Sequence, residues 1–335
     1  SLKEEVQVKE VVIPEKTDMT LNIKALDDLT TKFGYLIAKP ANVWMQEAAA
    51  RPMMRDLWNQ MLFENDLAIL FASSGSGKSI LATQIAHEIS QCERVLYLDC
   101  EMTDMQFQRR YEGFEFNPNF FRVELYPDAE KPQGVTDEEF IITSLEEATL
   151  SLGAKVIVVD NITYLKNDTE KAKDALSLMK RLKGLKLKHG LTVLAIAHTP
   201  KRDQSRPITP NDLAGSGMLY NFCDAVFAIG VGHDPRVRYV KQLKNRYTEN
   251  IYDAENVIVF EIEKRLDGFL GFRFVSYGRE MDYLAIRDKD QRDEQILSLR
   301  ITGNGVNEIA RQLKISPATV SRVLRKRNET VNSDN

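Results

Sequence analysis

Short apolar runs alternate with longer amphipathic stretches through the middle of the chain. The runs are rich in β-branched residues and predict strands at 67–71, Val95–Leu98, Val156–Val159, Val193–Ile196, Ala225–Ile229 and Val257–Ile262. Helical spacing predicts helices at Ile80–Ser90, Asp104–Tyr111, Asp137–Leu150 and Thr169–Lys188. This alternation is typical of an α/β domain whose mostly parallel sheet is covered on both faces.

The flanking segments have other patterns. Residues 1–30 lack sustained periodicity, residues 40–64 have helical spacing, and residues 236–277 are rich in strand-forming residues that predict hairpins at one sheet edge. A polar stretch follows, and then three short helical patterns. The predicted division is an arm with a lead-in helix at 1–60, the α/β domain at 61–277, a linker at 278–290, a small all-α domain at 291–328 and a tail at 329–335.

Composition narrows the protein class. The 335 residues are 43% hydrophobic and 28% charged, as in ordinary globular proteins, and no apolar run approaches the roughly 20 residues of a membrane span. Cys92, Cys100 and Cys223 show no metal-binding spacing, so we expect reduced thiols and a cytoplasmic protein. The net charge of −4 means that any contact with nucleic acid must be local, and only basic charges occur from Ala310 to Asn328.

Residues 72–79, ASSGSGKS, match the P-loop pattern G-x-x-x-x-G-K-[ST] except that Ala72 replaces the first glycine. Small residues let backbone N–H groups turn onto phosphates, and the positive end of the following helix adds attraction. We expect Lys78 to contact the β- and γ-phosphates of ATP and Ser79 to supply an oxygen to Mg²⁺. The predicted nucleotide-binding residues are Ser74, Gly75, Ser76, Gly77, Lys78, Ser79 and Ile80.

Two later strands end in carboxylates. In KVIVVDNIT, Asp160 follows an apolar strand and is placed to hold Mg²⁺ as a Walker-B aspartate does. In RVLYLDCEM, Glu101 follows the strand after the P-loop helix and is placed to deprotonate the attacking water. Asp99 is the alternative base.

A P-loop strand, a glutamate after the next strand and a Walker-B strand together resemble the core of RecA-type ATPases across residues 62–277. The resemblance implies that His198, at the end of TVLAIAH, senses the γ-phosphate. DLAGSGMLYNFCDAVFAI and VKQLKNRYTEN resemble segments of DnaB-type helicases and RadA-type ATPases. In such rings Lys244 and Arg246 would reach the neighbouring subunit's nucleotide, with Arg246 as an arginine finger that neutralises transition-state charge. Arg109 and Tyr111 are only positional candidates for contacts with adenine.

Two segments are candidates for DNA contact. The resemblance places a DNA-facing loop after the sensor strand, where TPKRDQSRPITPNDLAG supplies Lys201, Arg202 and Arg206; the loop near Lys166 is a weaker candidate. GNGVNEIARQLKISPATVSRVLRKRN resembles a helix-turn-helix, with Ser316 as the cap of its second helix. The side chains of that helix expected on duplex DNA are Pro317, Thr319, Ser321, Arg322, Arg325 and Lys326.

Together these features predict a DNA-dependent ATPase, most simply a hexameric ring helicase similar to the RepA-type replicative helicases of mobile elements. Single-stranded DNA would pass through the core, and the helix-turn-helix would tether the ring to duplex DNA. Two alternatives remain: an ATP-gated DNA-binding regulator or loader that unwinds nothing, and a repair or recombination ATPase similar to RadA.

Overall fold

The computed structural model describes residues 30–34, 36–162, 173–199, 202–213, 216–284, 288–313 and 315–333. The chain divides into two compact units, Ser1–Met54 and Arg55–Asn335. The first contains the antiparallel strands β1 (Thr31–Phe33) and β2 (Leu36–Ala38) and the helix α1 (Ala41–Ala49). Val43 of α1 is buried, whereas the apolar side chains of the two strands are exposed.

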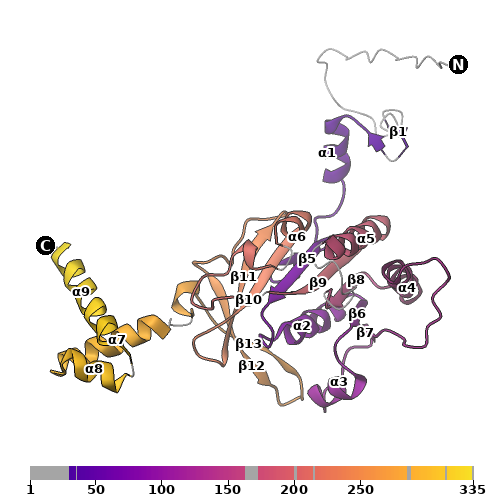
Figure 1. Cartoon of the computed structure of the whole chain (residues 1–335). Coiled ribbons are helices and arrows are strands. Elements are labelled where there is room, and N and C mark those ends of the chain that lie inside the picture. The colour runs from indigo at the N-terminus through magenta and orange to yellow at the C-terminus, as the bar shows by residue number, and fades with distance from the viewer. Residues whose placement is uncertain are drawn as a thin grey trace, which may run out of the picture. The chain divides into compact units, whose positions relative to one another are not determined.

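A nine-stranded sheet forms the body of the second unit (Figure 1), in the order β13-β12-β11-β10-β5-β9-β8-β6-β7. The six strands from β10 to β7 run parallel, and β11, β12 and β13 extend the sheet as an antiparallel edge. The strands are β5 (Leu67–Ala72), β6 (Val95–Asp99), β7 (Phe120–Val123), β8 (Val156–Asp160), β9 (Thr192–His198), β10 (Ala225–Val231), β11 (Val237–Asn245), β12 (Val257–Lys264) and β13 (Leu270–Gly278). This is the α/β architecture of a RecA-like P-loop NTPase core, as the alternation of elements predicts.

Helices cover both faces of this sheet because its central strands are apolar on both sides. Along β5, Leu67, Ile69 and Phe71 join one buried cluster, and Ala68 and Leu70 join the other. The first cluster packs on α4, α5 and α6, and the second on α2. The covering helices are α2 (Lys78–Ser90), α4 (Asp137–Leu152), α5 (Lys173–His189) and α6 (Ser216–Phe222), whereas α3 (Asp104–Arg110) has no fully buried residue.

The helix predicted across residues 40–64 is wrong beyond Ala49. The chain instead forms the short antiparallel strands β3 (Asp56–Trp58) and β4 (Leu62–Phe63). Asn59 and Gln60 have positive φ angles of 45° and 55°, which make the tight turn between them and cannot continue a helix. The predicted boundary at residue 60 therefore falls inside this hairpin.

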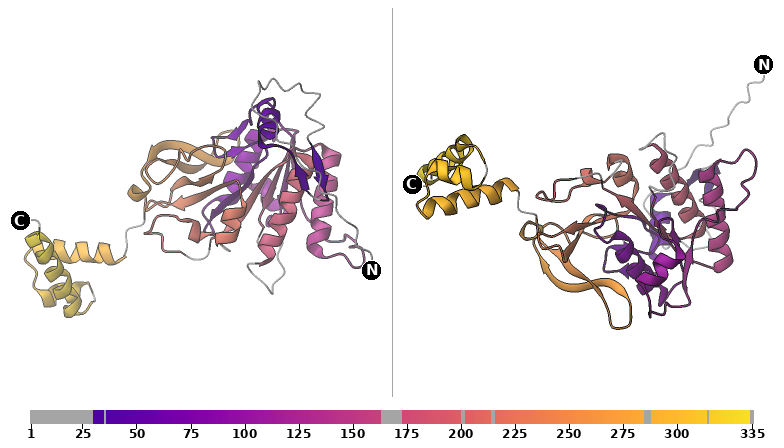
Figure 2. Two further views of the ribbon diagram at one scale, coloured as in Figure 1. Left: turned by 90° about the horizontal axis from the view of Figure 1, so that it is seen from above. Right: turned by 60° about the horizontal axis from the view of Figure 1, so that its bottom comes forward.

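Three helices pack on one another near the C-terminus (Figure 2): α7 (Asp288–Ile301), α8 (Val306–Gln312) and α9 (Pro317–Ser333). Their shared core comprises Ile296, Ile309, Ala310, Val320 and Val323. The Ser316 hydroxyl accepts a hydrogen bond from the Thr319 N–H (3.2 Å), which confirms the predicted cap of α9. α7 begins inside the predicted linker, and α9 continues beyond the predicted end of the domain at 328. Among the described residues, no helix combines the length and apolar character needed to cross a membrane.

Candidate functional site

The P-loop connects β5 to α2 and has the backbone that its sequence predicts. Gly75 and Gly77 adopt φ angles of 75° and 96°, a region that side chains disfavour. A Cβ at Gly77 would also lie 2.8 Å from Cδ1 of Ile262 and 3.0 Å from the ring of Phe272, so glycine is required there twice over. The loop therefore turns tightly into the first turn of α2, where backbone N–H groups have no partner within the helix.

Lys78 opens α2 and is buried beneath the loop. Its Nζ donates a hydrogen bond to the backbone carbonyl of Ser73 (3.0 Å). Burial lowers the pKa of this ammonium, and the nearby carboxylates of Glu101 and Asp160 oppose that shift. A desolvated cation without an ion pair in the described part of the chain is suited to bind phosphate oxygens.

Asp160 ends β8 and is almost fully buried. Tyr97 of β6 donates a hydrogen bond to its Oδ2 (2.6 Å), whereas Oδ1 has no partner of hydrogen-bond geometry among the described residues. Burial raises the pKa of Asp160 to about 6, and interactions with Tyr97 and Ser79 oppose the rise. A buried carboxylate oxygen left open beside a serine hydroxyl fits Mg²⁺, which prefers oxygen ligands. Ser79 and Asp160 are thus the residues that would hold the ion.

Glu101, Asn161 and His198 meet at the ends of three different strands. Asn161 Nδ2 donates to Glu101 Oε1 and lies 2.9 Å from His198 Nε2, and this ring nitrogen lies 3.3 Å from the same Glu101 oxygen. The Glu101 side chain keeps 41% of its surface exposed, so it can still meet a water molecule. Asn161 was absent from the sequence prediction, although its position directly after Asp160 is a signal that could have found it.

Both carboxylate oxygens of Asp99, the alternative base, are bonded to groups that hold the loop carrying Glu101. Its Oδ1 accepts hydrogen bonds from the backbone N–H groups of Glu101 (3.1 Å) and Met102 (2.9 Å). Its Oδ2 forms an ion pair with Arg122 (3.0 Å), which also donates to the Met102 carbonyl (2.6 Å). This fully buried carboxylate therefore positions the loop, whereas Glu101 keeps a partly exposed side chain.

The P-loop, Glu101, Asp160 and His198 all lie within a segment that matches a known family. Residues 37–204 match the sequence profile of the protein family described as "AAA domain". The chain belongs to this AAA domain family. It is therefore a P-loop protein and a nucleotide-dependent ATPase, a class of domain that generally binds ATP with Mg²⁺. The match ends at residue 204, so it includes neither the antiparallel strands β11–β13 nor the helices α7–α9.

The two candidate finger residues, Lys244 and Arg246, lie at the amino-terminal ends of the parallel strands, whereas the P-loop lies at their carboxyl-terminal ends. Asn245, at the end of β11, pairs with Ala225 of β10, which in turn pairs with Ala68 near the start of β5. The P-loop follows the other end of β5. Lys244 donates to the backbone carbonyls of Tyr220 (2.8 Å) and Asn221 (3.1 Å). Neither Lys244 nor Arg246 can therefore reach the phosphates of a nucleotide bound at the P-loop of the same chain.

Arg246 is held at this edge by contacts within its own chain. Its Nη1 pairs with Asp224 (3.2 Å), and its Nη2 donates to the Asn221 carbonyl (2.7 Å). Its side chain remains 49% exposed. Because contacts of such an exposed side chain are weak, Arg246 can leave Asp224 and Asn221 for a stronger partner.

The candidate DNA residues of the core differ in availability. Arg202 is only 10% exposed and lies 3.8 Å from Asp212, so it is engaged within the loop. Arg206 is 69% exposed, with a 3.3 Å contact to Asp203. Lys201 and the weaker loop near Lys166 lie outside the described residues.

The candidate DNA residues of α9 are largely open. Pro317, Ser321, Arg322 and Arg325 are exposed, and Thr319 is partly buried beside Ser316. Lys326 belongs to α9, but its side chain lies outside the described part of the structure.

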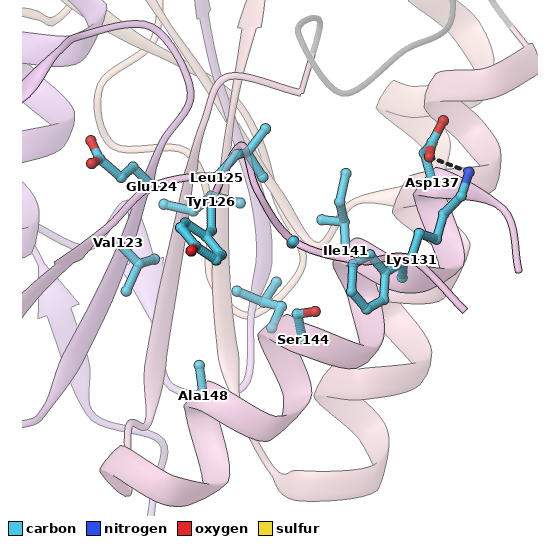
Figure 3. A pocket seen from close by; sticks show the side chains of 13 residues that line it. Val123, Glu124, Leu125, Tyr126, Lys131, Asp137, Ile141, Ser144 and Ala148 are labelled. Carbon is cyan, nitrogen blue, oxygen red and sulfur yellow. Dashed lines mark hydrogen bonds and ion pairs between the residues drawn. The ribbon is translucent and has the colours of Figure 1, made fainter. Parts of the chain in front are cut away.

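Of the two positional candidates for adenine, Tyr111 is buried in an aromatic cluster with Phe107, Phe116 and Phe269, which leaves it no access to a ligand. Arg109 lines an open pocket of about 490 Å³ together with Glu101. A second, apolar pocket of about 550 Å³ (Figure 3) lies between α4 and the segment after β7, and its rim carries the Lys131–Asp137 ion pair. The P-loop contributes nothing to the lining of this second pocket.

Proposed function

We propose that the chain is a DNA-dependent ATPase that works as an oligomeric ring, with a helicase of a replication or mobile-element system as its most specific form. The observation that carries this proposal is that Arg246 and Lys244 lie at one end of the parallel strands and the P-loop lies at the other end. Besides Lys78 of the phosphate cradle, an arginine finger would give the site a further cation for the transition state. A neighbouring copy would supply that cation, so each complete site needs two subunits.

Within one subunit, the proposed roles follow from the contacts. Backbone N–H groups of the P-loop hold the phosphates, and Lys78 exchanges its bond to the Ser73 carbonyl for a phosphate oxygen. Glu101 accepts the proton of the attacking water, and Asn161 and His198 fix its orientation. Bound Mg²⁺ supplies charge that neutralises the phosphate oxygens.

Arg246 of the neighbouring copy would then stabilise the charge that develops on the γ-phosphate. To reach it, the guanidinium must leave Asp224 and Asn221 of its own chain. Because exposed ion pairs contribute only about 0–1 kcal/mol, this release costs little. Assembly therefore completes the site without a large rearrangement.

The DNA contacts of this proposal divide between two regions. Arg206 and Lys201 of the loop after β9 would follow the backbone of single-stranded DNA. The exposed face of α9, with Arg322 and Arg325, would enter the major groove of duplex DNA. Exposed arginines beside the short side chains of Thr319 and Ser321 suit a mixture of phosphate and base contacts.

One observation favours the alternative of an ATP-gated regulator or loader. Arg202 is engaged with Asp212, which reduces the cations that the loop presents to a single strand. In that case nucleotide would control assembly on duplex DNA, and no strand would be unwound. A repair or recombination ATPase similar to RadA would share the same core and the same finger.

The test measures the ATPase rate of the full chain without DNA, with single-stranded DNA and with duplex DNA, for the wild type, Arg206→Ala and Arg325→Ala. The helicase proposal expects stimulation by single strands that Arg206→Ala reduces. Arg325→Ala should weaken duplex binding and lower its salt dependence by about one counterion, while leaving stimulation by single strands intact. A rate that responds only to duplex, or to no DNA, would reject the helicase and favour the regulator.

A further inference from the structure

Strand β11 reaches back to the P-loop through Arg238, a residue that the sequence motifs do not mark. Arg238 is the second residue of β11, near the carboxyl-terminal edge of the parallel strands, where it pairs with Val231 at the end of β10. Its Nε donates a hydrogen bond to the backbone carbonyl of Ser76 (3.0 Å). This contact joins residues 162 positions apart in the chain.

The bond to Ser76 fixes the orientation of a peptide group in the phosphate cradle. The carbonyl of Ser76 and the N–H of Gly77 belong to one planar trans peptide and so point in opposite directions. When Arg238 draws the carbonyl toward β11, the Gly77 N–H must turn to the other side of the loop. Ile262 of β12 and Phe272 of β13 pack against Gly77 itself and leave no room for a Cβ there.

Arg238 itself is held rigidly. Its Nη1 donates to the carbonyls of Pro235 (2.6 Å) and Val237 (2.9 Å), which lie in the turn before β11 and at its first residue. No carboxylate in the described part of the chain forms an ion pair with it, so its direction is set by these three carbonyls. A charged donor to a carbonyl is among the stronger hydrogen bonds in proteins.

We infer that Arg238 is a positioning residue for nucleotide binding: from β11 it orients the Ser76–Gly77 peptide so that the Gly77 N–H faces the phosphates of ATP. It acts through that peptide and does not itself contact the nucleotide. The inference depends on the P-loop of this ATPase and not on DNA or on a ring. It also gives the antiparallel edge, which lies outside the family match, a direct part in the cradle.

The side chains of glutamine and methionine provide a matched pair for the test. Glutamine Nε2 is bonded through the same number of atoms as arginine Nε, so Arg238→Gln keeps a donor where the Ser76 carbonyl needs it. Arg238→Met places a methyl group there. Both variants lose the Nη1 bonds to Pro235 and Val237, so both disturb the turn before β11 equally. Arg236→Ala is the control, because Arg236 lies in the same turn but is 79% exposed and pairs with Asp234 (2.8 Å).

The experiment measures the Kd of a fluorescent ADP analogue with Mg²⁺, the melting temperature without nucleotide, and kcat and KM for ATP. We expect Arg238→Met to raise Kd and KM by about tenfold or more, with kcat changed less than about threefold. Arg238→Gln should raise Kd by less than about threefold, and Arg236→Ala should leave it unchanged. Both Arg238 variants should lower the melting temperature by a similar amount.

Two results would overturn the inference. Equal increases of Kd in Arg238→Gln and Arg238→Met would mean that Arg238 matters only through the turn before β11. A wild-type Kd in Arg238→Met would mean that the Ser76–Gly77 peptide needs no support from β11.

Discussion

Buried charged groups differ between the two ends of the parallel strands, the carboxyl-terminal edge with the P-loop and the opposite, amino-terminal edge. At the carboxyl-terminal edge, Asp160 is buried with one oxygen open, Lys78 has no ion pair in the described structure, and Glu101 remains partly exposed. At the opposite edge, the charged groups satisfy one another. Asp224 accepts from Lys186 (2.6 Å), from Arg246 (3.2 Å) and from the backbone N–H of Leu67 (3.0 Å).

This difference indicates which edge is built to receive a ligand. Leaving a buried polar atom without a partner costs about 1–3 kcal/mol, a cost that is recovered when a ligand supplies the missing contact. The carboxyl-terminal edge carries such open groups and so gains from nucleotide and Mg²⁺. The opposite edge gains nothing from a small ligand, and its exposed cation Arg246 is instead available to a second copy of the chain.

The largest expected effect comes from removing that cation. If Arg246 acts on the neighbouring site, Arg246→Ala should lower kcat by about 10³-fold or more, because arginine fingers contribute about 10³–10⁵. Nucleotide affinity should change little, since the residue lies far from the P-loop of its own chain. Steady-state ATPase measurements and ADP binding would check both parts.

Mixing two inactive variants tests whether Glu101 of one chain and Arg246 of another form one active site. In a mixture of Arg246→Ala and Glu101→Gln, some sites combine the intact Glu101 of one chain with the intact Arg246 of the other. We expect activity to reappear on mixing and to depend on protein concentration. If the mixture stays as inactive as its components, the two edges do not form one site across an interface.

The next effect lies within the carboxyl-terminal edge itself. If Glu101 is the base, Glu101→Gln removes it but keeps the hydrogen bonding toward Asn161 and His198, so kcat should fall by about 10²–10³-fold while ATP still binds. Asp99→Asn is the contrasting variant. Because Asp99 holds Arg122 and the loop backbone, its loss should lower the melting temperature as well as the rate. Equal kinetic and thermal effects in both variants would contradict the separate roles.

Much of the carboxyl-terminal edge was predictable from the sequence. Asp99, Asp160 and His198 each end a short apolar strand, and parallel strands bring such ends to one edge of a sheet. The P-loop was predictable because its chemistry depends on a contiguous set of small residues. The helix α9 and its Ser316 cap were visible for the same reason, since a cap and an apolar stripe are local patterns.

The missed features depend on contacts between distant segments. Arg238 resembles any arginine at the start of a strand, and only the fold brings it to Ser76. Residues 56–63 have helical spacing, but Trp58 and Leu62 are buried against α2 and the sheet as a hairpin. Tertiary burial decided that segment, because periodicity in a short apolar stretch cannot separate a helix from strands. The contacts of Asp224 were not predictable either, since its three partners, Leu67, Lys186 and Arg246, come from distant segments of the chain.

The smallest expected effect is a pH dependence at the opposite edge. Burial raises the pKa of Asp66 to about 6, with a further contribution from nearby Asp224, while the N–H of Phe63 (2.8 Å) opposes the rise. The folded chain therefore holds this proton up to about pH 6, whereas the unfolded chain releases it near pH 4. Between these values the folded state binds more protons, so the free energy of unfolding falls as pH rises.

Asp66→Asn removes this titration while keeping an oxygen for the Phe63 N–H. Relative to wild type, the variant should gain stability progressively from about pH 4 to about pH 6, by at most about 2–3 kcal/mol. Denaturant unfolding at a series of pH values measures the difference between the two proteins, which cancels contributions from other groups. ADP with Mg²⁺ should leave this difference unchanged, because Asp66 lies before β5, at the end away from the P-loop. A constant difference across the window would show that Asp66 ionises normally, and a difference that nucleotide abolishes would show that the two edges are not independent.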